Sequence, residues 1–204
     1  MPPMIRLHGF PMSPNTRRAL FGLEESGLAY ELVPVDLMSA EHRSDEYRKL
    51  NPTARVPVMV DGEFVLWESN AILEHLAARV PDKQFAPKNE QERGRFSQWM
   101  FMNAAHLSPA MAHIFAHTIR LPEDQRIPQM VVNGRAEVAR CLGPLNAHLE
   151  GREWVADRFT LIEQSIAPTL SVAAMIGVDL AQYPHAGAWL ARIQARPAYQ
   201  KIYG

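Results

Sequence analysis

Two kinds of hydrophobic pattern divide the chain. In the N-terminal part, segments with the two-residue period of β-strands alternate with segments that have the period of amphipathic helices. The period of two predicts strands at residues 4–9, 30–37, 56–60 and 64–67, the last two joined as a hairpin. The helical period predicts helices at 13–27 and 68–80, with a polar segment of loop and short helix at 39–52. This order, β-α-β-α-β-β-α, predicts a small α/β unit with a mixed sheet.

An all-helical pattern follows. Residues 81–94 are polar and contain two prolines, which is typical of a linker. Farther along, apolar residues recur at helical spacing in residues 96–115, 138–149 and 186–196. We therefore predict an α/β domain at 1–80, a linker at 81–90 and an all-helical domain at 91–204.

The helical part also contains a signal for the start of a helix. Thr160 lies three residues before Glu163, which is the spacing of a capping box. We interpret this pair as a folding element and not as a catalytic group. Pro168 follows in the same apolar pattern and is expected to kink or end the helix.

Composition and charge narrow the classes of protein. With 47% hydrophobic and 21% charged residues, the chain of 204 residues has the composition of a soluble globular protein. A net charge of -1 gives no field that would favour nucleic acid or an anionic membrane surface. Cys141 is the only cysteine, which excludes an internal disulfide and fits a reducing compartment. With no signal-peptide or membrane-span pattern, we expect a cytoplasmic protein without a membrane partner.

Pro57 interrupts the strand pattern of residues 56–60. A proline removes a ladder hydrogen bond and is normally excluded from a central strand. One interpretation is an edge strand that tolerates the proline and has no ligand role. The other is a cis Val56–Pro57 bond, which turns the chain so that the Val56 backbone points outward and can pair with an extended peptide. Spacing alone does not choose between them.

Neighbouring motifs favour the cis interpretation of Pro57. Together with "FPMSPNTRR" (10–18) and "WESNAI" (67–72), the stretch resembles the thioredoxin-like N-terminal domain of cytosolic glutathione transferases. Members of that family carry a cis-proline after a valine, a Glu-Ser pair that opens the third helix, and a capping box in a helical C-terminal domain. The resemblance covers essentially the whole chain and points to serine-type members, the phi class and its bacterial relatives.

The resemblance implies a fold, a co-substrate and an assembly. The fold would be a thioredoxin-like domain with a mixed four-stranded sheet, followed by an all-helical domain that holds an electrophile pocket. The co-substrate would be glutathione, with no metal, and the protein would be a homodimer. Thr53 stands where many relatives place an aromatic residue that locks the subunit interface, which weakens any prediction of how the dimer is fastened.

Ser13 is the candidate catalytic residue. Glutathione reacts as its thiolate, and a free thiol with a pKa of about 8.5 is only a few per cent ionised at neutral pH. The Ser13 hydroxyl can donate to the sulfur, and the start of the first helix adds backbone N–H donors and a positive helix end. A serine before a proline also commonly caps a helix, and without the resemblance that role would be preferred. Asn15 is a second candidate donor to the same sulfur.

Glu68 and Ser69 are expected at the amino-acid end of the tripeptide. That end needs an acceptor for its ammonium group and donors for its carboxylate, and an acidic side chain beside a helix N-terminus supplies both. The same residues also fit an ordinary helix start, with Ser69 as the N-cap and Glu68 as a nearby acid. The two roles are compatible.

Further glutathione-binding residues follow from the resemblance. His42 and Arg43 match a His-Lys pair that holds the glycine carboxylate, with arginine in place of lysine. Arg55 stands beside the Val-Pro pair and could reach the same carboxylate. The backbone at Val56 and Pro57 would align the peptide.

The pocket for the second substrate is the least constrained part of the site. We assign to its lining Met12 near Ser13, and His106, Met111 and Phe115 on one helical stripe. A stripe of methionine and aromatic residues at helical spacing is more often part of the core than of a pocket.

Two other histidines and the cysteine need a separate interpretation. His113 and His117 have the spacing of a metal-binding pair, but no third ligand is evident and we predict no metal site. We expect both histidines to border the pocket for the second substrate instead. Cys141 lies in an apolar helical pattern and is expected to be a buried structural thiol.

Two functions from different classes fit these residues. The preferred one is a glutathione transferase that joins the thiolate to small hydrophobic electrophiles in detoxification, with glutathione peroxidase or dehalogenase side activity open at the same site. The alternative is a binding or regulatory protein of the same fold without significant turnover. The presence of Ser13, His42, Glu68 and Ser69 favours the enzyme.

Overall fold

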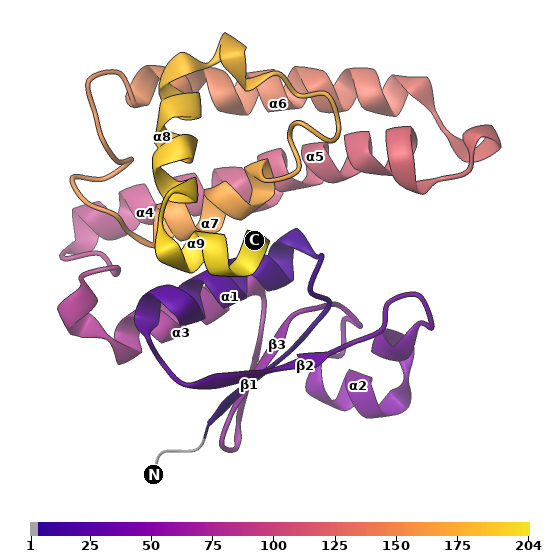
Figure 1. The fold of residues 1–204 in the computed structure, drawn as a ribbon, viewed down its shortest axis with the longest axis vertical. Helices are drawn as coiled ribbons and strands as arrows, with labels where there is room; N and C mark the ends of the chain where they lie inside the picture. The colour runs from indigo at the N-terminus through magenta and orange to yellow at the C-terminus, as the bar shows by residue number, and fades with distance from the viewer. Residues whose placement is uncertain (1–3) are drawn as a thin grey trace. The chain divides into compact units, whose positions relative to one another are not determined.

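The computed structural model describes residues 4–204 and divides them into two compact units (Figure 1). The first unit comprises the chain as far as Ala86 together with residues 197–204, and the second comprises residues 87–196. The C-terminal segment therefore belongs to the α/β unit and not to the all-helical domain predicted at 91–204. The division after Ala86 falls inside the linker predicted at 81–90.

A four-stranded mixed sheet organises the first unit. Its strands, in the spatial order β2-β1-β3-β4, are β1 (Ile5–Gly9), β2 (Tyr30–Pro34), β3 (Val58–Asp61) and β4 (Phe64–Trp67). β1 pairs with β2 in parallel and with β3 antiparallel, and β3 and β4 form the hairpin. The mixed sheet is thus confirmed, and β2, which ends in a proline, is an edge strand. The strand predicted at 56–60 begins only at Val58, so Pro57 precedes the strand instead of interrupting it.

Helices cover this sheet. They are α1 (Pro14–Ser26), α2 (Asp45–Leu50), α3 (Ser69–Arg79) and α9 (Pro197–Tyr203), with short 3₁₀ turns at Glu41–Arg43 and Pro81–Lys83. α1 ends as its sequence predicts, because Gly27 adopts a φ of 72° and its N–H bonds the carbonyl of Leu23. In Figure 1, α1 and α3 lie on the same side of the sheet.

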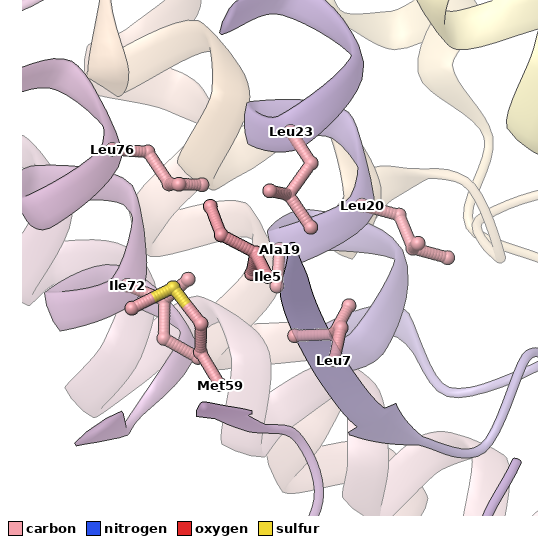
Figure 2. Packing of buried hydrophobic residues seen from close by; sticks show 8 residues of the cluster. All are labelled: Ile5, Leu7, Ala19, Leu20, Leu23, Met59, Ile72 and Leu76. Atoms are coloured by element: carbon pink, nitrogen blue, oxygen red, sulfur yellow. The ribbon is translucent and has the colours of Figure 1, made fainter. Parts of the chain in front are cut away.

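Apolar residues fill both faces of the sheet. On one face, side chains of α1 and α3 meet those of β1 and β3 (Figure 2), and the cluster consists of Ile5, Leu7, Ala19, Leu20, Leu23, Met59, Ile72 and Leu76. On the other face, Tyr47 of α2 joins Val58 and Val60. The alternation along β3 directs Met59 to one face and its two neighbours to the other. These two cores fix where the ends of α1, α2 and α3 lie.

The turn between β1 and α1 is especially tight. A Cβ added at Gly9 would lie 2.5 Å from Cγ2 of Thr16, so only glycine allows the strand end to approach the first turn of α1 this closely. This contact sets the path of residues 10–13, which lead into the helix.

The second unit is helical, as predicted. Its helices are α4 (Glu90–Met102), α5 (Ser108–Phe115), α6 (Pro128–His148), α7 (Leu161–Leu170) and α8 (Pro184–Gln194). π-helical turns at Asn103–Leu107 and Ala116–Arg120 flank α5, and 3₁₀ turns lie at Glu123–Gln125 and Leu180–Gln182. Across residues 4–204, none of the helices combines the length and the apolar character needed to span a bilayer.

α7 continues beyond Pro168 to Leu170, so the helix does not end at the proline. A proline inside a helix lacks the N–H of one intrahelical bond and disfavours continuation. Here every residue of α7 is buried, and the packing of its neighbours compensates for the lost bond.

The predicted capping box at the start of α7 is present and belongs to a larger network. The carboxylate of Glu163 accepts the Thr160 N–H at 2.8 Å and, through its other oxygen, the Val155 N–H at 2.8 Å. The indole N–H of Trp189 donates to the same carboxylate at 3.4 Å. Burial raises the pKa of Glu163, although these hydrogen bonds favour the charged form. The pair is structural, as the sequence predicts.

We predict that Glu163→Ala lowers the free energy of unfolding by about 3 kcal/mol, because two buried backbone N–H groups lose their acceptor. Urea unfolding of the full chain measures this change. Glu153→Ala is the matched control, because its side chain is 66% exposed and the change should cost less than about 0.5 kcal/mol. Equal effects of the two substitutions would contradict the role given to Glu163.

Candidate functional site

The first unit contains a small hollow where α1, the segment before β3 and the start of α3 meet. Its volume is about 50 Å³ and its lining consists of Asn15, Asn51, Arg55, Val56, Pro57, Glu68 and Ser69. The segment before β3 and the start of α3 therefore bring together five of the eight residues predicted for glutathione binding, which are Arg55, Val56, Pro57, Glu68 and Ser69. Ser13, His42 and Arg43 are not in this lining.

The Val56–Pro57 peptide bond is cis, as one of the two interpretations of the sequence expects. The ladder of β3 begins after Pro57, and within residues 4–204 the N–H and C=O of Val56 have no hydrogen-bond partner. The preceding carbonyl is held, because the Tyr47 hydroxyl and the Asn51 amide both donate to the oxygen of Arg55, at 2.9 and 2.8 Å. The main chain of Val56 is thus fixed in place and available to a ligand.

Arg18 lies beneath the hollow and was missed by the sequence analysis. Its side chain is 4% exposed, and Nη1 donates to Oδ1 of Asn15 at 2.7 Å and to Oγ of Ser69 at 2.8 Å. Burial lowers the pKa of Arg18 to about 10, so the guanidinium stays charged at neutral pH. A charged residue next to Ala19 and Leu20, within the buried face of α1, was the signal that could have revealed it.

This buried charge orients the two side chains that it contacts. A guanidinium group can only donate, so the carbonyl oxygen of Asn15 faces Arg18 and its amide N–H groups remain for a ligand. Ser69 likewise uses an oxygen lone pair toward Arg18 and keeps its O–H as a donor. The hollow is therefore lined by preoriented donors from α1 and α3.

Ser13 caps α1. Its Oγ accepts the N–H of Thr16 at 3.4 Å, and its own N–H donates to the carbonyl of Phe10 at 2.9 Å. The side chain is half-buried, one residue before α1 begins. Capping uses only the acceptor capacity of the hydroxyl, so its proton remains available to a ligand.

Glu68 has an unusual backbone. Its φ is 73° and its ψ is 112°, a region that residues other than glycine adopt at a cost of order 1–3 kcal/mol. Glu68 occupies the N-cap position of α3 without a capping side-chain bond, and Ser69 is the first helical residue. The expectation that Ser69 is the N-cap is therefore wrong by one position. The strained backbone places an acidic side chain in the lining at the positive end of α3.

His42 and Arg43 lie in the 3₁₀ turn that precedes α2. Arg43 is exposed, whereas His42 is half-buried and its Nδ1 is buried with no hydrogen-bond partner in the described part of the chain, residues 4–204. The structure does not bring this pair into the lining of the hollow.

The residues assigned to the second substrate are dispersed. The second unit has an open groove of about 620 Å³ between the α4–α5 stretch and α6, and His106 is in its lining, with Nδ1 3.2 Å from Oε1 of Glu137. Met111 is 2% exposed and belongs to the core, and neither it nor Phe115 lines the groove. Met12 belongs to the first unit and is 58% exposed.

The remaining candidate groups are two histidines and the cysteine. His113 and Cys141 both lie in the lining of the groove. His117 accepts the N–H of Ile127 on Nδ1 at 3.2 Å. Among residues 4–204, no group of three or more His, Cys, Asp and Glu side chains is arranged to hold a metal ion. Cys141 is 5% exposed, and burial raises the pKa of its thiol to about 11.

Comparisons with known proteins agree with this geometry. The sequence profile of the family described as "Glutathione S-transferase, N-terminal domain" matches residues 3–78. Glutathione S-transferase 3 of Zea mays is 33% identical, in a match that spans 97% of this chain and 92% of that protein. The crystal structure of glutathione transferase URE2P5 from Phanerochaete chrysosporium superposes with a TM-score of 0.91 at 27% identity, covering 98% of this chain and 93% of that one.

A third comparison concerns a complex. Glutathione transferase URE2P6 from Phanerochaete chrysosporium, solved with oxidised glutathione, superposes with a TM-score of 0.90 at 26% identity. The match covers 98% of this chain and 94% of that one.

We predict that Cys141 resists alkylation and disulfide reagents in the folded protein. With a pKa of about 11, about one thiol in ten thousand is ionised at neutral pH, and the thiolate is the reactive form. Mass spectrometry after iodoacetamide treatment should find the native protein unlabelled and the urea-unfolded protein labelled once. Rapid labelling of the native protein at neutral pH would show that the thiol is neither buried nor suppressed.

Proposed function

Because the chain belongs to the glutathione S-transferase family, we propose that it joins the thiolate of glutathione to small hydrophobic electrophiles. The observation that carries the proposal is the hollow in which the cis Val56–Pro57 bond meets the donors oriented by Arg18. The hollow presents the main-chain N–H and C=O of Val56, which can pair with an extended peptide. Beside them lie Asn15, Glu68 and Ser69, which can bind the charged amino-acid end of a ligand. A tripeptide thiol with a free amino-acid end matches both features.

Each part of glutathione has a partner in this proposal. The main chain of Val56 pairs with the backbone of the cysteinyl residue. The Ser69 hydroxyl and the first N–H groups of α3 hold the carboxylate of the γ-glutamyl end, and Glu68 accepts its ammonium group. Arg55 holds the glycine carboxylate at the edge of the hollow, assisted by His42 and Arg43.

The chemistry requires an ionised sulfur. Lowering the thiol pKa by about two units takes roughly 2.7 kcal/mol of preferential thiolate stabilisation. The Ser13 hydroxyl donates to the sulfur, and the N-terminal end of α1 adds its positive field. The thiol proton passes to solvent. The sulfur lone pair then forms a bond to the electrophilic carbon, and the leaving group departs with its bonding electrons, or a proton completes an addition.

Other parts of the proposal concern the second substrate and the setting. We assign the electrophile-binding residues to the helical domain, where His106 is the better candidate because it lines a groove. The protein would act in the cytoplasm as a homodimer, in detoxification, without nucleic-acid or membrane partners. Glutathione peroxidase and dehalogenase activities would use the same thiolate.

Ser13→Ala should lower kcat for conjugation of an aryl halide about tenfold to a hundredfold, because a hydrogen bond to a charged sulfur is lost. The affinity for glutathione should change less than about threefold, since the binding contacts lie elsewhere. Steady-state kinetics and calorimetry measure the two quantities. Asn89→Ala is the matched control, because it removes the N-cap of α4 and should leave kcat unchanged.

The outcome also separates the competing hypotheses. An unchanged kcat in Ser13→Ala would transfer the thiolate-stabilising role to Asn15. Retention of the native protein on immobilised glutathione, without turnover of any electrophile in a broad panel, would instead support a binding or regulatory protein. No retention and no turnover would contradict both.

A further inference from the structure

The C-terminal helix α9 lies along α1 within the first unit (Figure 1). Arg17, Phe21 and Glu24 follow the spacing of four and three residues that places side chains on one face of a helix. This face of α1 contacts α9 at three places, through Tyr203, Tyr199 and Lys201 respectively. The contacts run the length of α9 and reach the turn of α1 next to Ser13.

The contacts differ in strength. Phe21 and Tyr199 are both buried, with ring centroids 5.6 Å apart and planes at 90°, a favourable edge-to-face geometry. Lys201 Nζ lies 2.8 Å from Oε1 of Glu24, but the lysine side chain is 68% exposed and contributes little. Aromatic contact therefore anchors α9 on α1. The ring of Tyr203 stacks on the ring of Tyr199, with ring centroids 4.2 Å apart and an interplanar angle of 13°. The position of the Tyr203 ring therefore depends on the contact between Tyr199 and Phe21.

Arg17 links this aromatic stack to the loop before α1. Its guanidinium carbon lies 4.3 Å from the centre of the Tyr203 ring, a cation–π contact. From this position Nε donates to the carbonyl of Pro11 at 3.0 Å and Nη2 contacts Sδ of Met12 at 3.4 Å. Pro11 and Met12 are the two residues immediately before Ser13. The Tyr203 ring therefore positions the Arg17 guanidinium, which in turn contacts Pro11 and Met12 in the loop before Ser13.

We propose that Tyr203 is a positioning residue for the conjugation reaction, acting through Arg17 to fix the loop that carries Ser13. The inference rests on the proposed function of Ser13. An arginine side chain has many rotamers, and an aromatic platform selects the one that reaches both Pro11 and Met12. Without the ring, the loop loses part of its restraint and the hydroxyl is less often directed at the sulfur. A 1 Å displacement at a reacting group is enough to affect rate strongly.

The first measurement does not depend on turnover. The amide hydrogen exchange of Ser13, whose N–H donates to the carbonyl of Phe10, is compared in the native protein, Tyr203→Leu, Tyr203→Phe and Lys201→Met. Tyr203→Leu should speed exchange at the Ser13 amide about fivefold, because the cation–π contact is lost. Tyr203→Phe keeps the ring and should match the native protein. Lys201→Met removes a contact of the same helix that does not reach the loop and should also match it.

The second measurement tests the consequence for the reaction. In Tyr203→Leu, kcat for conjugation should fall about fivefold with little change in the KM for glutathione, and the apparent pKa of the bound thiol, read from thiolate ultraviolet absorbance, should rise. Tyr203→Phe should restore native values. Arg17→Lys, which keeps the charge but cannot reach both contacts, should reproduce the loss even if Tyr203→Leu folds poorly.

Three outcomes would overturn the proposal. They are unchanged exchange at Ser13 in Tyr203→Leu, equally fast exchange in Lys201→Met, and a Tyr203→Phe protein as defective as Tyr203→Leu. A native protein that binds glutathione without turnover would refute the proposed function, whereas the exchange measurement would still decide whether Tyr203 orders the loop.

Discussion

One buried charge organises the candidate site. Arg18 lies under the hollow, and a guanidinium in that environment is tolerated only when its N–H groups have acceptors. Two of these acceptors are Asn15 in α1 and Ser69 in α3, so the same group joins the starts of both helices and orients a donor from each. The strained backbone of Glu68 persists beside this junction, where the surrounding structure determines its conformation.

The opposite wall of the hollow is main chain, and it is equally preorganised. Tyr47 and Asn51 hold the carbonyl of Arg55, and beside the cis bond the Val56 backbone has no hydrogen-bond partner among residues 4–204. The sheet and its two apolar cores fix the positions of α1, α2 and α3 relative to the Arg55–Val56 main chain. A ligand would meet groups that are already ordered, which reduces the entropic cost of binding. The fold thus contributes to function by fixing the distance between the Val56 main chain and the donors of Asn15 and Ser69.

Sequence patterns predicted the parts of this structure that depend on local rules. The strands, α1 with its end at Gly27, and the capping box of α7 follow from periodicity and capping chemistry. The pattern of α1 marks Arg18 as a charge on a buried face, but its acceptor Ser69 is distant in sequence, so its partner and role follow only from the fold. The place of α9 in the first unit was missed for the same reason, since it depends on rings that meet only after folding. The cis bond was one of two interpretations of the sequence, because spacing does not determine the isomer of a peptide bond. The structure has the cis isomer, and β3 begins after Pro57.

Glutathione is expected to bind in the preformed hollow next to Arg18 and Pro57, through the main chain of Val56 and the donors of α1 and α3. The most direct measurement is a glutathione titration of the isotope-labelled protein, followed by NMR of backbone amides and of the Asn15 side-chain amide. We expect the signals of Asn15, Val56 and Ser69 to shift together and to saturate with one dissociation constant. Saturable shifts confined to other parts of the chain, or no shifts at millimolar glutathione, would contradict it.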